Sequence, residues 1–145
     1  MFVNPFSFVS QPGLTAGTTA QAKIEQATTT EEVILPPELK ATCGCESNWD
    51  PYSEPRQFGD DGLPLQGKNY HDQLIVNEDG STTTVKVHWS SDWGACQIND
   101  ATWDAEAKRL GLDYKNSKND NYKMALHVKD VQGMDAWKHS GSCSR

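Results

Sequence analysis

The sequence predicts an α+β protein, in which a mostly helical domain carries a small antiparallel β-hairpin. Three segments have the start and stop residues of helices. A strand pattern with an Asp-Gly turn lies between the first and the second of these segments. The chain has 145 residues, a length typical of one domain.

The folded domain is expected over residues 34–145. Residues 1–33 are rich in Thr, Ala, Gly and Gln and show neither a helical nor a strand period. Such a composition is typical of a linker or a disordered arm. All five Trp and all four Cys lie at or after Cys43, which places the material for a core in the later part of the chain.

The first helix is expected from about Pro37 to Ser47. A proline in the first turn followed by Glu38 is typical of a helix start. Pro51 disfavours helix in the residue before it, so the helix should end before Asn48.

A loop and a hairpin follow this helix. Residues 52–68 contain several Pro and Gly, which indicates a loop. Strands are expected over residues 72–76 and 82–89, joined by a turn over residues 77–80 that ends in Asp-Gly. The second strand alternates apolar and polar residues with a period of two.

The last third of the sequence is expected to be helical. One helix should begin at Asp100 as its N-cap and end at Gly111. Another should run over residues 120–132 and end at Gly133, with an apolar face. A short helical turn is expected over residues 134–139.

Charge and hydropathy exclude several classes of function. The net charge is −7, whereas a nucleic-acid-binding protein needs a basic face. No apolar run of transmembrane length occurs. The spacing Cys43-Gly-Cys45 and the four scattered His residues do not match a metal site, so no metal and no other cofactor is expected.

Glu46 and Asp92 are the candidate catalytic residues. Glu46 lies at the end of the first predicted helix, where the helix dipole favours the protonated acid that a glycosidase needs. Asp92 follows the hairpin among hydroxyl neighbours, which favours the charged form. Each alone could be a surface or turn residue. Two carboxyl groups in opposed environments are the working pair of most glycosidases.

Three segments resemble c-type lysozymes. Cys-Glu-Ser-Asn-Trp (45–49) resembles the family's E-S-N-F, and Ser-Ser-Asp-Trp-Gly-Ala-Cys-Gln-Ile-Asn (90–99) resembles S-T-D-Y-G-I-L-Q-I-N. Gly-Met-Asp-Ala-Trp (133–137), followed by Cys143, resembles G-M-N-A-W. The resemblance implies a lysozyme-like fold and a muramidase that cleaves the β-1,4 bonds between N-acetylmuramic acid and N-acetylglucosamine in peptidoglycan. Lysozyme is itself the type example of this acid pair.

The roles of individual residues come from the same resemblance. Glu46 would be the general acid, and Asp92 the nucleophile or stabiliser. Ser47 and Asn48 would orient the acid, and Trp103 would be a sugar-stacking platform or a core anchor. The substrate-binding positions implied are Ser47, Asn48, Gln97, Asn99, Trp103, Ala136 and Trp137.

Two other functions stay open. Glu-Ser-Asn-Trp-Asp-Pro (46–51) followed by Gly-Ala-Cys-Gln-Ile-Asn (94–99) is also similar to lytic transglycosylases and resuscitation-promoting factors, which use the Glu alone. Asp92 favours hydrolysis over the transglycosylase reaction. A non-catalytic glycan-binding or structural module is the third possibility.

The four cysteines could form two disulfides, with three possible pairings. The resemblance implies Cys45–Cys143. Cys96 replaces a core leucine of that family and is expected to face the same helix, so Cys43–Cys96 is predicted as the second pair, with two buried free thiols as the alternative. Disulfides indicate an extracellular or periplasmic location in the cell envelope. The expected partner of a monomeric protein is peptidoglycan or a related N-acetylated glycan.

Overall fold

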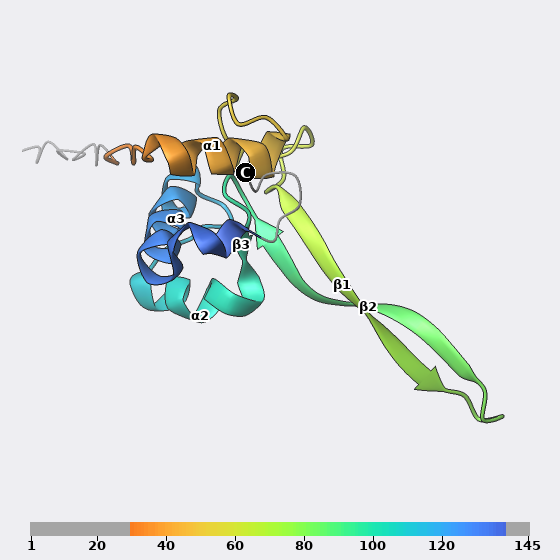
Figure 1. Ribbon diagram of the computed structural model, residues 1–145. Coiled ribbons are helices and arrows are strands. Elements are labelled where there is room, and N and C mark those ends of the chain that lie inside the picture. The colour runs from red at the N-terminus through yellow and green to blue at the C-terminus, as the bar shows by residue number, and fades with distance from the viewer. Residues whose placement is uncertain (1–29, 139–145) are drawn as a thin grey trace, which may run out of the picture. The chain divides into compact units, whose positions relative to one another are not determined.

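The computed structural model describes residues 30–138, and these residues form the α+β arrangement that the sequence predicts (Figure 1). The described residues from Glu31 onward belong to one compact unit. Residues 1–29 and 139–145, with Cys143, lie outside the described part. The elements are α1 (Pro37–Asn48), β1 (Gln66–Val76), β2 (Thr82–Trp93), β3 (Ile98–Asn99), α2 (Asp100–Leu110), α3 (Lys118–Gln132) and the 3-10 helix η1 (Gly133–Trp137).

The helices lie close to their predicted places because their end residues are strong signals. α1 begins at Pro37, and α2 and α3 end at Gly111 and Gly133, both at positive φ. The predicted N-cap of α2 is corrected. Asn99 is the cap, since its side chain accepts from the Thr102 amide, while Asp100 accepts from the Ser91 amide instead.

The strands are longer than predicted. β1 and β2 pair antiparallel from Gln66↔Trp93 to Val76↔Thr82, and the short β3 pairs with the end of β2. The predicted loop 52–68 therefore ends at residue 65. Gly67 contributes to the loop prediction, but it occupies β1, where an added Cβ would lie 2.9 Å from the Gln97 Oε1 atom.

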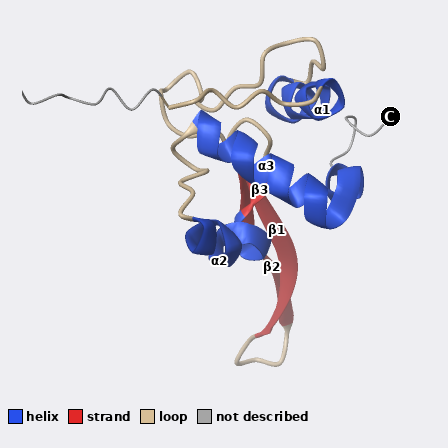
Figure 2. Ribbon diagram, turned by 90° about the vertical axis from the view of Figure 1, so that its left-hand side faces the viewer, coloured by secondary structure: helices blue, strands red, loops and turns tan. Residues whose placement is uncertain are grey.

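The core is formed by α1, α3 and the turn between β2 and β3. Figure 2 shows α3 between α1 and α2. Leu39 of α1, Met124 and Val128 of α3, and Cys96 of the turn are almost completely buried. The pairing of Cys43 with Cys96 is confirmed, and this disulfide joins α1 to the turn. The pair Cys45–Cys143 stays a prediction, since Cys143 is outside the described residues.

The chain is attached to the domain before its first helix. The Val33 amide donates to the Asn119 side chain, which in turn donates to the Glu31 carbonyl. Among residues 30–138, no helix has both the length and the apolar character needed to cross a membrane.

Candidate functional site

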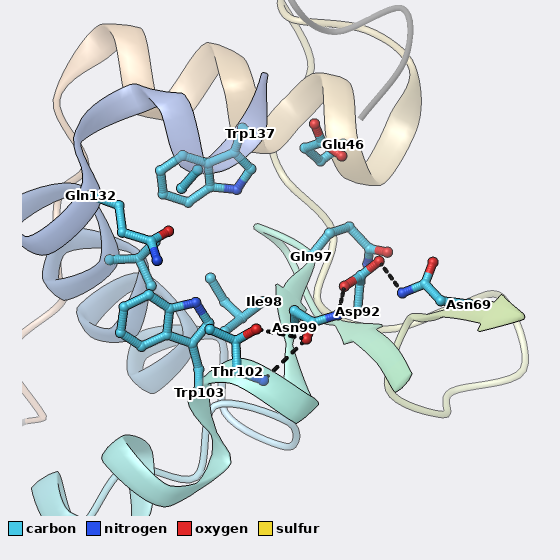
Figure 3. Close-up of a pocket in the computed structure, with 12 residues that line it drawn as sticks. Glu46, Asn69, Asp92, Gln97, Ile98, Asn99, Thr102, Trp103, Gln132 and Trp137 are labelled. Carbon is cyan, nitrogen blue, oxygen red and sulfur yellow. Dashed lines mark hydrogen bonds between the residues drawn. The ribbon is translucent and has the colours of Figure 1, made fainter. Parts of the chain in front are cut away.

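A cleft of about 380 Å³ lies between the end of α1, the strands, α2 and η1 (Figure 3). It brings together six of the predicted site residues with the candidate acid Glu46. The lining residues are Glu46, Asn69, Asp92, Gln97, Ile98, Asn99, Thr102, Trp103, Val128, Gln132, Ala136 and Trp137. Both candidate catalytic carboxyl groups thus belong to one cavity, although they are far apart in the sequence.

Glu46 lies in the last turn of α1 and is half-buried. Figure 3 shows it on the α1 side of the cleft and Asp92 on the sheet side. Trp137 of η1 is buried beside the same cleft, and its indole N–H donates to the Cys96 carbonyl at 2.9 Å. This hydrogen bond fixes the ring as an apolar wall of the cavity.

The Asp92 carboxylate is held from both sides by side-chain amides. Asn69 donates to Oδ2 at 2.8 Å, and Asn99 donates to Oδ1 at 2.8 Å. Both amides also contact the buried Ser90 Oγ, at 3.2 and 3.1 Å. With one donor on each oxygen, the carboxylate has a fixed plane and position.

Asn99 has a second task in this arrangement. Its Oδ1 atom accepts from the Thr102 amide at 3.1 Å and caps α2, while its Nδ2 atom binds Asp92. The Asn99 side chain therefore contributes both to the start of α2 and to the position of the Asp92 carboxylate. This coupling follows from the direct passage of β3 into α2 at Asn99.

The turn at residues 94–97 carries Gln97 into the lining of the cleft and is held by two buried side-chain amides. Gln57 accepts from the Ala95 amide, and Asn121 accepts from the Cys96 amide. Both side chains donate in turn to the Tyr114 carbonyl. Buried polar groups of this kind are costly unless every partner is satisfied, and here they fix the backbone that carries Gln97.

Gln97 itself lines the cleft and has a left-handed backbone conformation, with φ 51°. Its Nε2 atom donates to the Gly94 carbonyl at 2.9 Å. A left-handed backbone is unfavourable for a residue with a Cβ and is found mainly where the surroundings enforce it, often at functional sites.

Trp103 and Ala136 line the cleft near α2 and η1. The Trp103 ring is half-buried and meets His127 edge to face, with ring centroids 6.0 Å apart. His127 contacts Glu106 at 3.0 Å. Trp103 thus packs against the core on one side and lines the cavity on the other, and its role as a sugar-stacking platform stays a prediction.

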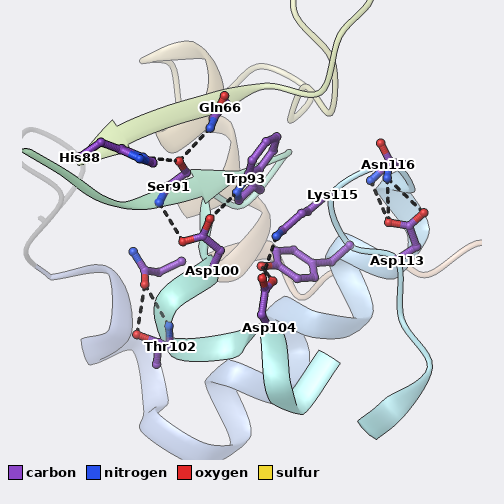
Figure 4. Close-up of polar contacts among 12 residues, drawn as sticks. Gln66, His88, Ser91, Trp93, Asp100, Thr102, Asp104, Asp113, Lys115 and Asn116 are labelled. Atoms are coloured by element: carbon purple, nitrogen blue, oxygen red, sulfur yellow. Dashed lines mark hydrogen bonds and ion pairs between the residues drawn. The ribbon is translucent and has the colours of Figure 1, made fainter. Parts of the chain in front are cut away.

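Asp100 supports the strand segment behind Asp92 (Figure 4). It accepts from the Ser91 amide at 2.8 Å and from the Trp93 indole at 3.0 Å. Burial acts to raise the pKa of Asp100, but these two hydrogen bonds, together with the charge of Lys115 and the Ala101 amide, outweigh it and lower the pKa below its ordinary value. The charged carboxylate therefore ties the first turn of α2 to β2.

Ser47 and Asn48 do not line the cleft. The Ser47 hydroxyl donates to the Cys43 carbonyl and accepts from the Arg56 amide. The Asn48 side chain donates to the Glu54 carbonyl at 2.8 Å. Both side chains hold the loop after α1, because α1 ends in a left-handed Trp49 that turns the chain back along the helix.

Five lining residues were not predicted: Asn69, Ile98, Thr102, Val128 and Gln132. Asn69 lies between the predicted loop 52–68 and the predicted strand 72–76, so the direction of its side chain could not be inferred. Thr102 could have been found from the helix start that Asn99 caps. Among residues 30–138, no three His, Cys, Asp or Glu side chains form a group that could hold a metal ion.

Comparisons with known proteins do not add a family to this description. No protein-family model matches the chain, and no curated protein or solved structure is significantly similar to it. The chemistry of the cleft therefore has to be argued from its own residues.

Proposed function

We propose that this protein is a glycoside hydrolase of the lysozyme-like type. It cleaves the β-1,4 bonds between N-acetylmuramic acid and N-acetylglucosamine in peptidoglycan, in an extracellular or periplasmic location. One observation carries the proposal: Glu46 from α1 and Asp92 from β2 line the same cleft. A proton donor and a fixed carboxylate in one cavity are the minimum equipment for this hydrolysis.

The reaction follows from the two positions. Glu46 gives its proton to the glycosidic oxygen, and the bond from that oxygen to the sugar C1 breaks. Asp92 stabilises the resulting positive charge or forms a bond to C1. Water then attacks C1 and returns a proton to Glu46. The amide donors Asn69 and Asn99 keep Asp92 in place throughout, so little reorganisation is needed in the transition state.

The other lining groups suit an N-acetylated sugar chain. The side chains of Gln97 and Gln132 offer amide donors and acceptors for sugar hydroxyl and N-acetyl groups, whereas the amide of Asn99 is already engaged by Asp92 and Thr102. Trp103 presents an aromatic surface on which a pyranose ring can pack. Apolar walls with a few directed polar groups are typical of small-molecule sites.

The order of elements supports the lysozyme-like fold as part of the proposal. A helix ends in the acid, a β-hairpin then delivers the second carboxylate, and a late Trp closes the cleft. A lytic transglycosylase would use Glu46 alone. The double amide contact of Asp92 favours the hydrolase, because a carboxylate without a role would not need such support.

Product analysis on purified peptidoglycan, beside chitin oligomers, tests the proposal. Mass spectrometry should show reducing ends and no 1,6-anhydro ends. Glu46→Gln should lower kcat by about 10³-fold or more, since it removes the general acid. Asp92→Asn should lower kcat by about 10²-fold or more, since it removes the charge that stabilises the cation.

Matched controls lie on the same elements. Glu38→Gln changes an exposed acid in the first turn of α1, and Asp72→Asn changes an exposed acid of β1. Both should retain activity. Exclusively 1,6-anhydro products with an active Asp92→Asn variant would identify a transglycosylase. Full activity of Glu46→Gln would exclude both enzymes.

A further inference from the structure

The strand segment that carries Asp92 is paired unequally on its two sides. On one side, β1 continues alongside residues 90–93 of β2. On the other side, the two residues of β3 pair only with Asp92 and Trp93. The chain then enters α2 at Asp100. Within the described part of the chain, Ser91 therefore has a strand partner on β1 but none on β3.

The side chain of Asp100 takes the place of this third pair (Figure 4). Its Oδ1 atom accepts from the Ser91 amide at 2.8 Å, as the carbonyl oxygen of a further β3 residue would. Its Oδ2 atom accepts from the Trp93 indole at 3.0 Å. One carboxylate thus binds the residue before Asp92 and the residue after it.

The charge and the place of Asp100 strengthen both contacts. Its pKa lies below the ordinary value despite burial, so the carboxylate is charged at neutral pH. Hydrogen bonds to a charged acceptor are roughly twice as strong as those between neutral groups. Asp100 also belongs to the first turn of α2, where the helix dipole favours a negative charge.

The two donors are themselves held in place. Ser91 is almost completely buried, and its hydroxyl accepts from the Gln66 side-chain amide at 2.8 Å. The Trp93 ring packs against the core, and the Lys115 ammonium lies 5.3 Å from the centroid of this ring. Asp100 therefore connects the start of α2 to a well-packed part of β2.

Asp100 is not among the described residues that line the cleft, so an effect on the reaction would act through Asp92. Asn69 and Asn99 hold the oxygen atoms of the Asp92 carboxylate, whereas the contacts of Asp100 hold the backbone from which that side chain extends. A misplacement of 1 Å in a reacting group can lower the rate by about 10²-fold.

We propose that Asp100 is a positioning residue for the catalytic carboxylate: by binding Ser91 and Trp93, it holds the backbone on both sides of Asp92 where the reaction at the sugar C1 requires it. The inference rests on the proposed function, because that function gives Asp92 the role of nucleophile or stabiliser. It deepens the function by making the start of α2 a support for the acid, since Asn99 holds the carboxylate and Asp100 holds its backbone.

The decisive experiment is a double-mutant cycle between Asp100 and Asp92, with steady-state kinetics on soluble peptidoglycan fragments. Asp100→Ala should lower kcat by about tenfold and change KM by less than about twofold, because the side chains that line the cleft are unchanged. In the Asp92→Asn background, the same change should lower the residual kcat by less than about twofold, because the charge to be positioned is gone. Asp100→Asn, which keeps one acceptor oxygen, should lose less activity than Asp100→Ala. An unchanged kcat in Asp100→Ala, or equal losses in both backgrounds, would overturn the inference.

Asp120→Ala is the matched control. Asp120 is also a half-buried acid in the first turn of a helix, and it accepts from a backbone amide outside that helix, that of Asp113 at 3.0 Å. The Asp120→Ala variant should keep the wild-type kcat, and urea unfolding shows whether the two variants lose similar stability. A loss of kcat equal to that of Asp100→Ala would assign the effect to helix starts in general and overturn the inference.

Amide hydrogen exchange locates the change within the molecule. In Asp100→Ala, exchange at the Ser91 amide should become faster, while exchange at the Thr102 amide, which Asn99 caps, should not change. An equal rise at Thr102 would show that the start of α2 is lost, which would overturn the positioning role. These results are separate from the proposed function, which fails only if the wild-type protein cleaves neither peptidoglycan nor chitin oligomers.

Discussion

At the scale of single residues, the position of the Asp92 carboxylate depends on two asparagines that differ in their other contacts. Asn99 also caps α2, so its loss would disturb a helix together with the carboxylate. Asn69 contacts Asp92 and Ser90 and belongs to the middle of β1. Replacement of Asn69 therefore tests the position of the acid with less effect on the fold.

Asn69→Ala should lower kcat by about tenfold or more, because small errors in the position of a reacting group are costly. Its effect on stability should be only about 1 kcal/mol, the usual net value of a hydrogen bond. Steady-state kinetics on peptidoglycan and urea unfolding give the two quantities. Asn77→Ala, which removes contacts to Ser81 and Thr83 in the hairpin turn, is the control and should keep full activity. A loss of stability that accounts for the whole loss of activity would contradict the positioning role.

At the scale of elements, the helices and the hairpin could be predicted because their ends carry local signals. Each of these signals determines the conformation of only the few residues around it. They are Pro37, Gly111, Gly133 and the turn before Ser81. The extension of β1 over residues 66–71 could not be predicted. That pairing is decided by contact with Ser90 and Asp92, and long-range contacts of this kind leave no period in the sequence.

The sequence motifs predicted part of the candidate site, but not which neighbours of the acid face the cleft. Glu46, Asp92, Gln97 and Trp137 lie in the cleft where the motifs placed them. The motif also contains Ser47 and Asn48, but residues next to the acid on a helix point in other directions, about 100° apart for each step. The local sequence therefore indicates which segment lies at the site, and the helix geometry decides which of its side chains face the cavity.

Among the elements, the turn after β2 depends on a single glycine. Gly94 has φ 72°, and an added Cβ would lie 2.5 Å from Asn121 Nδ2 and 2.5 Å from Gln57 Oε1. Gly94→Ala should lower the free energy of unfolding by about 3 kcal/mol or more, through backbone strain and displaced buried amides. Gly62→Ala is the matched control. Gly62 has φ 75° with open space around it, so it should lose only about 1 kcal/mol. Equal losses in urea unfolding would show that the Gln57 and Asn121 contacts add nothing.

At the scale of the whole molecule, the Cys43–Cys96 disulfide connects the two sides of the cleft. Cys43 lies one turn before Glu46 on α1, and Cys96 lies on the turn that follows Asp92. The two sides are separated by 53 positions in the sequence. The disulfide therefore acts on the fold and on the relative position of the two acids together.

Replacement of both cysteines, Cys43→Ala with Cys96→Ala, should lower the free energy of unfolding by about 4 kcal/mol, the chain-entropy value for a loop of this length. Variants are preferable to a reductant, which would act on every disulfide in the chain. If the disulfide also holds Glu46 opposite Asp92, kcat should fall at temperatures where circular dichroism still shows the folded protein, while KM changes less. Urea unfolding and peptidoglycan kinetics over a temperature series separate the two effects. Activity that follows only the folded fraction would limit the disulfide to stability and leave the placement of the acids to the Asn69, Asn99 and Gln57 contacts.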